Sequence, residues 1–305
     1  MSVPARAALP SHPVIRLDAA TVLLQWAVGG LLFLWVTTRG REVGIGYGWL
    51  VRSTYIVMAL GAFALGVWLD PVPVRDVSAL AVAAAAGVAL GVSIVRRKAG
   101  VSGQQEEFDR RSERVAAMTG IERTVVTEAP TEAGRATHGA EFPPVLDLIP
   151  PLLGVPGLVA AGLAAGDPAL LSVARVLVGA AFLGSISDGM LLGHWYLVQP
   201  GLARKPLLEM VRWTGIIWPF EIAVLIWPIG MLSVLAGTVD DGYGGLLGWF
   251  WLACAVATLG LLIVTRAALR ERYYSAVMAA TGLLYLAILT AFGMDIIARA
   301  VLAPG

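Results

Sequence analysis

Ionisable side chains inside long apolar segments are the residues of this sequence that could carry chemistry. Asp188 and Glu221 stand out, because each lies within an apolar segment and has no basic residue at its own estimated depth. A charge in hydrocarbon is costly unless it is paired, hydrated or neutralised. A buried carboxylate without a partner can therefore take up or release a proton. We interpret Asp188 and Glu221 as candidate proton-handling residues; the structural alternative is a hydrogen bond to a carbonyl that a nearby proline leaves free.

A second polar group lies toward one end of the same two segments. His194, Tyr196 and Arg212 are expected near the cytoplasmic interface, where they would line a quinone-sized pocket or the end of a proton path. Asp188 and His194 differ by six positions, or ~9 Å along a helix, so they cannot bond each other directly on an unbroken helix. The alternative is interfacial anchoring, which is common for aromatic side chains at this depth.

The remaining charges inside the apolar segments suggest two ion pairs between helices. With a rise of ~1.5 Å per residue, Arg175 and Asp295 fall at ~13 Å and ~11 Å on the outer side of the bilayer centre. Arg52 and Asp147 fall at ~9 Å and ~11 Å on the inner side. We expect both pairs to be structural.

Small residues predict where helices approach one another closely. Ser185, Gly189 and Gly193 repeat every four residues and form a stripe that favours helix packing. We interpret this stripe as a packing seam.

The segment that carries Glu221 also contains two Trp-Pro steps, at Pro219 and Pro228. Each proline removes an amide donor and crowds the preceding turn, which leaves the carbonyls near Gly215 and Val224 free to accept another hydrogen bond. We interpret the two steps as kinks within one span.

The composition places these segments in a membrane. Of 305 residues, 58% are hydrophobic and 14% are charged, against roughly 25% charged residues in soluble domains. The mean hydropathy is +0.78. A net charge of +1 gives no general attraction to nucleic acid, so a nucleic-acid partner is not expected.

The apolar runs predict an all-α, polytopic membrane protein with eight transmembrane helices. Each run is about long enough to cross a hydrocarbon core of ~30 Å. The predicted spans cover residues 19–38, 47–69, 77–95, 144–165, 169–198, 207–236, 245–268 and 273–302. The chain thus divides into a tail at 1–18, three helices within 19–95, a loop at 96–143 with a short surface helix near 104–118, and five helices within 144–302.

Basic residues predict the orientation of these helices. Cytoplasmic loops retain an excess of Lys and Arg. Most of the 22 basic residues fall at connections that share one side if the N-terminus is outside. We therefore expect both termini on the outer side, the 96–143 loop in the cytoplasm, and the chain in a bacterial cytoplasmic membrane.

Several classes of membrane enzyme are not expected. Two histidine ligands are needed for a b-type haem, and His12 and His138 lie outside the predicted spans. The single cysteine, Cys254, allows neither an intrachain disulfide nor a cysteine metal cluster. Asp240 and Asp241 are flanked by glycines and predict a solvated turn. We therefore expect no haem or metal ligated by this chain alone.

Three functional hypotheses follow. The first is an integral subunit of a bacterial respiratory or other energy-converting complex, which helps to form a quinone site or a proton path on the cytoplasmic side. The second is a transporter of small solutes or ions with a mid-membrane carboxylate site at Glu221. The third is a scaffold for membrane-complex assembly. The expected partners are the lipid bilayer and other membrane subunits.

Overall fold

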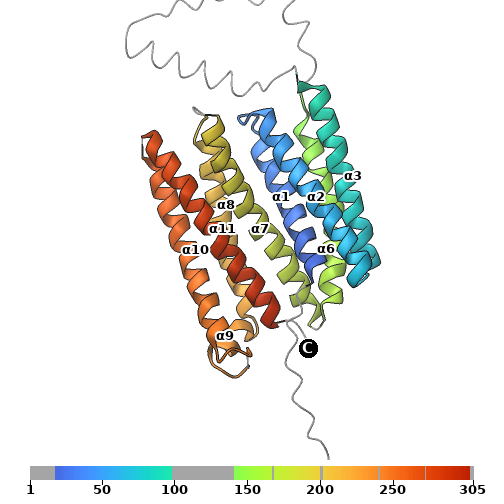
Figure 1. Ribbon diagram of the computed structural model, residues 1–305, viewed down its shortest axis with the longest axis vertical. Coiled ribbons are helices and arrows are strands. Elements are labelled where there is room, and N and C mark those ends of the chain that lie inside the picture. Colours follow the sequence, from blue (N-terminus) through green and yellow to red (C-terminus); the bar gives the residue numbers. More distant parts are fainter. Residues whose placement is uncertain are drawn as a thin grey trace, which may run out of the picture.

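The protein is a bundle of long helices. A computed structural model describes residues 18–97, 141–166, 168–199, 202–239, 241–271 and 273–302. The described helices are α1 (Ala19–Thr38), α2 (Ile45–Leu69), α3 (Pro73–Val95), the 3-10 helix η2 (Pro144–Asp147), α6 (Ile149–Ala164), α7 (Ala169–Val198), α8 (Lys205–Ile226), α9 (Gly230–Leu235), α10 (Leu246–Arg270) and α11 (Tyr274–Leu302). The long helices run side by side along the long axis of the molecule (Figure 1). The loop expected to carry a surface helix lies almost entirely outside the described residues.

Seven of the described helical segments are long and apolar enough to cross a membrane. They are α1, α2, α3, η2 with α6 (Pro144–Ala164), α7, α10 and α11. The chain is therefore a multi-pass membrane protein in contact with a lipid bilayer. Helix α8 is not among the seven, because its 22 residues carry Lys205, Glu209, Arg212 and Glu221. The count of eight spans stays a prediction.

The predicted span at 207–236 is not one helix. Helix α8 ends at Ile226, and the short helix α9 begins at Gly230. The Trp227–Pro228 step lies between them, and its peptide bond is cis. A proline cannot donate to the helical hydrogen-bond ladder and clashes with the preceding turn, which explains why α8 ends here. Pro219, by contrast, stays inside α8.

Helix α7 joins two halves of the bundle. It packs against α1 and α6 on one side and against α8 and α11 on the other. Helices α1, α2, α3 and α6 form one half, and α8 to α11 form the other (Figure 1). Among the described helices, α1 and α8 make only a small direct contact across this boundary. Residues on α7 can therefore contact both halves.

Helix α7 approaches α1 closely at Gly184, one position before the predicted stripe. A Cβ atom at Gly184 would lie 2.1 Å from the carbonyl carbon of Gly29 on α1. In the stripe itself, Gly193 accepts a hydrogen bond of 3.0 Å from the Thr281 hydroxyl of α11. A Cβ at Gly189 would have its nearest neighbour at 3.7 Å, an ordinary contact. The third member of the stripe, Ser185, is buried and donates to the Phe182 carbonyl of its own helix.

The two ends of the bundle differ in their basic residues. We call the end at which α1 and α10 finish and α8 starts the basic end; it lies toward the top of Figure 1. The described basic residues at or near this end are Arg39, Arg41, Arg52, Arg96, Arg97, Arg204, Lys205, Arg212, Arg266 and Arg270. Those toward the opposite end are Arg75, Arg175 and Arg299.

Candidate functional site

Asp188 lies in a buried polar cluster between α7 and α2. Its side chain is completely buried. The Tyr55 hydroxyl donates to Asp188 Oδ1 over 2.6 Å, and the Tyr47 hydroxyl lies 3.4 Å from the Asp188 carbonyl oxygen. Asp188 Oδ2 has no hydrogen-bond partner among the described residues. One carboxylate oxygen is thus held by a tyrosine, and the other remains free to carry a proton.

The same cluster reaches toward the basic end through Tyr47. This tyrosine is fully buried, and its electrostatic neighbours include Thr37 of α1 and Tyr196 of α7. Thr37 is buried as well and lies two residues before Arg39, near the end of α1. Protonatable and hydroxyl groups therefore continue from Asp188 toward one end of the bundle.

Glu221 belongs to a second cluster, near the opposite end. It lies five residues before the end of α8, because the helix stops at Ile226. Its electrostatic neighbours are Asp295 and Arg299 of α11 and Arg175 of α7. Glu221 is fully buried, and neither of its carboxylate oxygens has a hydrogen-bond partner among the described residues. The depth estimate that placed Glu221 at mid-membrane without a nearby cation assumed an unbroken helix over 207–236.

Asp295 is paired with Arg299, whereas the sequence suggested Arg175. Arg299 Nε lies 2.9 Å and 2.8 Å from the two carboxylate oxygens of Asp295, one turn away on the same helix. Arg175 instead donates to the carbonyls of Val224 and Trp227, each over 2.9 Å. The Val224 carbonyl is one of those that the sequence predicts a proline to leave free. Arg175 therefore binds the interrupted end of α8.

Arg52 and Asp147 form a buried ion pair between α2 and η2. Arg52 donates to both carboxylate oxygens, over 2.7 Å and 2.6 Å, and the two side chains are 2% and 1% exposed. The Thr38 hydroxyl donates to Asp147 over 2.9 Å, and Phe142 lies against the guanidinium with its ring centroid 4.4 Å away. A small cavity of about 40 Å³ adjoins Arg52. All charged atoms of the pair thus have protein partners, which indicates a structural role.

The structure places His194, Tyr196 and Arg212 in different surroundings. His194 is exposed, and its Nδ1 lies 3.0 Å from the hydroxyl of Tyr285 on α11. Tyr196 is buried, and its hydroxyl donates to the Ala203 carbonyl. Arg212 is exposed on α8 and lines a different space. The structure brings only Tyr196 close to the Asp188 cluster.

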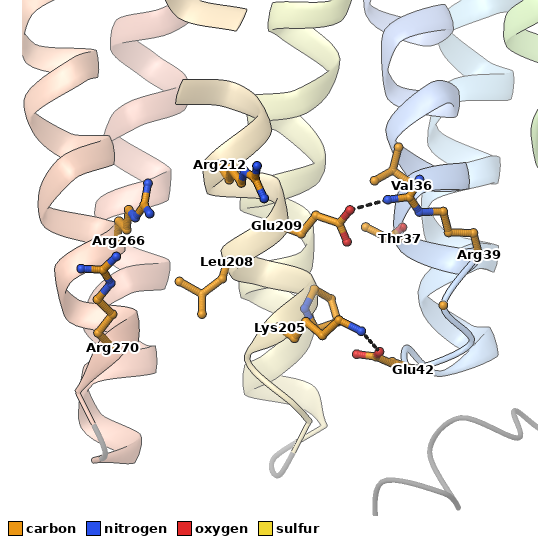
Figure 2. Close-up of a pocket in the computed structure, with 12 residues that line it drawn as sticks. Val36, Thr37, Arg39, Glu42, Lys205, Leu208, Glu209, Arg212, Arg266 and Arg270 are labelled. Atoms are coloured by element: carbon orange, nitrogen blue, oxygen red, sulfur yellow. Dashed lines mark hydrogen bonds and ion pairs between the residues drawn. The ribbon is translucent and has the colours of Figure 1, made fainter. Parts of the chain in front are cut away.

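The space beside Arg212 is a pocket of about 570 Å³ at the basic end. It is lined by Val36, Thr37, Arg39, Gly40, Glu42, Lys205, Pro206, Leu208, Glu209, Arg212, Arg266 and Arg270. Figure 2 shows Glu209 of α8 directed toward Arg39 and Lys205 directed toward Glu42, with Arg266 and Arg270 on α10. Thr37 lines this pocket and is also an electrostatic neighbour of Tyr47, so it lies between the pocket and the Asp188 cluster.

Sequence reasoning missed several residues of these sites. Tyr47 and Tyr55 carry hydroxyls within an apolar span, and their eight-residue spacing places them near one helix face. The i, i+4 spacing of Asp295 and Arg299 could have predicted their pairing. Nothing in the sequence brings Arg266 and Arg270 to the same pocket as Arg212, because this depends on how α8 packs against α10.

The described residues include no group of three or more His, Cys, Asp or Glu side chains that could hold a metal ion. The search against protein-family models gives no match, and the searches of curated proteins and of solved structures give none either.

Proposed function

We propose that this chain is a proton-handling subunit of an energy-converting complex, such as a respiratory complex, in the bacterial cytoplasmic membrane. Protons would pass between Asp188 and the cytoplasm by way of the basic end. The observation that carries the proposal is the fully buried Asp188, which has a tyrosine on one oxygen and no partner among the described residues on the other. Such a group can bind and release a proton when its surroundings change.

The groups around Asp188 support a path toward the basic end. Tyr47 contacts Asp188 and has Thr37 as an electrostatic neighbour, and Thr37 lines the pocket at that end. Hydroxyl groups can donate and accept hydrogen bonds at once, so they can relay a proton between a carboxylate and water. In this proposal the pocket supplies the water.

The distribution of basic residues supports the proposed orientation. At the opposite end, Arg75 and Arg299 form ion pairs, and Arg175 binds backbone carbonyls. These three arginines are thus held by protein groups, whereas Arg97, Arg212, Arg266 and Arg270 at the basic end are exposed. An excess of exposed positive charge is typical of the cytoplasmic side. We propose that the basic end is cytoplasmic, that both termini are outside, and that α8 is the eighth span.

Quinone binding fits this geometry less well than proton transfer. The pocket volume of about 570 Å³ is adequate for a cofactor-sized ligand. Its lining, however, includes five basic side chains and two acidic ones, and neither His194 nor Tyr196 belongs to it. A quinone would therefore bind where partner subunits complete a site, and we assign it no residues here.

A second candidate function is transport of a small solute or ion at Glu221. The observation that favours it is a buried carboxylate with two unpartnered oxygens among the described residues, beside Asp295, Arg299 and Arg175. A helix interrupted close to such a group is a common feature of transporter sites. In this case Glu221 would be essential and Asp188 would not.

One experiment separates the two candidates. Proteoliposomes containing the purified protein are driven by a potassium diffusion potential, and proton uptake is followed with an enclosed pH dye. For the proton path, we expect Asp188→Asn to lower the rate at least about tenfold and Tyr55→Phe to lower it less. Tyr243→Phe is the matched control, because Tyr243 is 60% exposed in the α9–α10 connection.

The outcomes are distinct. An unchanged rate in Asp188→Asn contradicts the proton path, whereas solute-dependent uptake that Glu221→Gln abolishes supports the transporter.

Purification in mild detergent tests whether the chain belongs to a larger complex. Co-purifying cytochrome or iron–sulfur subunits, detected by visible spectra, would support a subunit of a redox complex; a complex without redox partners would contradict it.

A further inference from the structure

The pocket at the basic end carries more positive charge than its acidic residues balance. Its basic side chains are Arg39, Lys205, Arg212, Arg266 and Arg270, and its acidic side chains are Glu42 and Glu209. Both acids are already engaged: Arg39 pairs with Glu209, and Lys205 pairs with Glu42 over 2.8 Å. These pairs link the α1–α2 connection to the start of α8. The pocket is left with the charge of three arginines.

The three remaining arginines have no partner in the described part of the chain. Arg212, Arg266 and Arg270 make no ion pair or hydrogen bond with it, and all three are exposed. Arg266 and Arg270 are one turn apart, so they lie on the same face of α10. Figure 2 shows Arg212 on α8 between these arginines and the two ion pairs. The three guanidinium groups thus come from two helices to one pocket.

We propose that this pocket binds a phosphate-bearing anion, held by Arg212, Arg266 and Arg270. A guanidinium presents planar donors that match phosphate oxygens, and arginine is favoured wherever phosphate is recognised in two-point contacts. The pocket volume of about 570 Å³ also exceeds what a bare phosphate needs. The bound group therefore carries further atoms beyond the phosphate.

The position of the pocket favours the headgroup of an anionic phospholipid. Arg270 is the last residue of α10, and Arg266 lies one turn before it, at the level where headgroups meet helix ends. Apolar side chains of Val36, Pro206 and Leu208 line the same pocket and suit the glycerol and acyl portions. Basic pockets between membrane helices on the cytoplasmic side are suited to such headgroups. A soluble phosphate compound shares the chemistry and is the other source.

Specific binding differs from the general attraction of any basic membrane surface. General attraction depends on the number of charges near the surface, whichever residues carry them. Arg97 provides the comparison, because it is exposed at the same end, after α3, and does not line the pocket. Loss of Arg97 removes the same charge as loss of Arg266 but leaves the pocket intact.

The test measures lipid binding to the full chain in neutral detergent by native mass spectrometry. The probes are phosphatidylglycerol, phosphatidylcholine, glycerol 3-phosphate and inorganic phosphate. We expect phosphatidylglycerol to be preferred over phosphatidylcholine, with affinity falling at least about fivefold in Arg266→Gln/Arg270→Gln and little in Arg97→Gln. Glu209→Gln has the opposite expected effect, because it releases Arg39 into the pocket and raises affinity.

The results either identify the phosphate group as that of a lipid or of a soluble compound, or contradict the proposal. Lipid binding that inorganic phosphate does not displace supports a headgroup, and binding of glycerol 3-phosphate without lipid supports a soluble compound. Equal affinity for both lipids with no binding of either soluble phosphate contradicts the proposal. So does an equal loss in Arg97→Gln, or weaker binding in Glu209→Gln. The variant Arg266→Lys/Arg270→Lys preserves the charge and should retain part of the affinity. The inference does not depend on proton transfer, because binding and proton uptake are measured separately.

Discussion

Arg52 and Asp147 illustrate how much a single enclosed charge depends on its partner. Their side chains are 2% and 1% exposed, and Arg52 uses two nitrogens to hold both oxygens of Asp147. Removing one member of a buried pair leaves an uncompensated charge and costs roughly 3–5 kcal/mol. We expect Asp147→Leu to lower the free energy of unfolding in mixed detergent micelles by this amount.

The double variant Arg52→Met/Asp147→Leu is the control for this prediction. Replacing a whole buried pair by apolar residues is often neutral or stabilising, so most of the lost stability should return. The hydroxyls of Thr38 and Ser93, which interact with the pair, limit the recovery. A double variant as unstable as Asp147→Leu would indicate that packing, and not charge, dominates this site.

The contact between α1 and α7 depends on a glycine. A Cβ at Gly184 would lie 2.1 Å from the Gly29 carbonyl carbon, and backbone atoms cannot move aside as a flexible side chain can. Overpacking of this kind costs roughly 1–3 kcal/mol. We expect Gly184→Ala to lower the free energy of unfolding by that amount. Gly91→Ala on α3 is the matched control, because a Cβ there meets nothing within 4 Å. Equal stability of the two variants would contradict the close approach.

The start of α10 depends on Asp241. Its carboxylate accepts from the backbone amides of Gly245 (2.8 Å), Tyr243 (2.9 Å) and Leu247 (2.8 Å). These amides, Gly245 first, hold the pKa of Asp241 below its ordinary value of 3.8. The folded state thus favours the ionised carboxylate. Its stabilising effect is present above pH 3.8 and is lost as the pH falls through the lowered pKa.

Amide hydrogen exchange tests this pH dependence. We expect the protection factors of Gly245 and Leu247 to be constant near neutral pH and to fall when Asp241 is protonated in acid. In Asp241→Asn the side chain does not ionise, so protection should be lower at neutral pH and show no such step. If the fall in protection persists in Asp241→Asn, another titrating group causes it. The sequence predicted only a solvated turn here, and Asp240 lies outside the described residues.

At the level of the whole molecule, the sequence predicted the positions of most helices but not their neighbours. Apolar runs such as 19–38 and 169–198 match α1 and α7, because a span of lipid demands a long apolar helix. The predicted span over 207–236 is not one helix in the structure, because Pro228 ends α8 and brings Glu221 near the end of its helix. Depth estimates assume that each run is one straight helix.

Side-chain partners were harder to predict, because they depend on helix rotation and packing. Depth alone suggested Arg52 with Asp147, and these two residues are in contact in the structure. Depth alone also suggested an ion pair between Arg175 and Asp295, yet Asp295 pairs with Arg299. Both arginines lie on the same side of the bilayer centre by that estimate, so depth could not choose between them. The tyrosines beside Asp188 come from α2, which is far from α7 in sequence.

The two halves that meet at α7 are also connected by ion pairs at the basic end. The pocket lies across this junction, with walls from α1 on one side and from α8 and α10 on the other. Two ion pairs, Arg39–Glu209 and Lys205–Glu42, connect these walls, and both are partly exposed and therefore screened by salt. High ionic strength would thus weaken the connection between the two halves at the basic end.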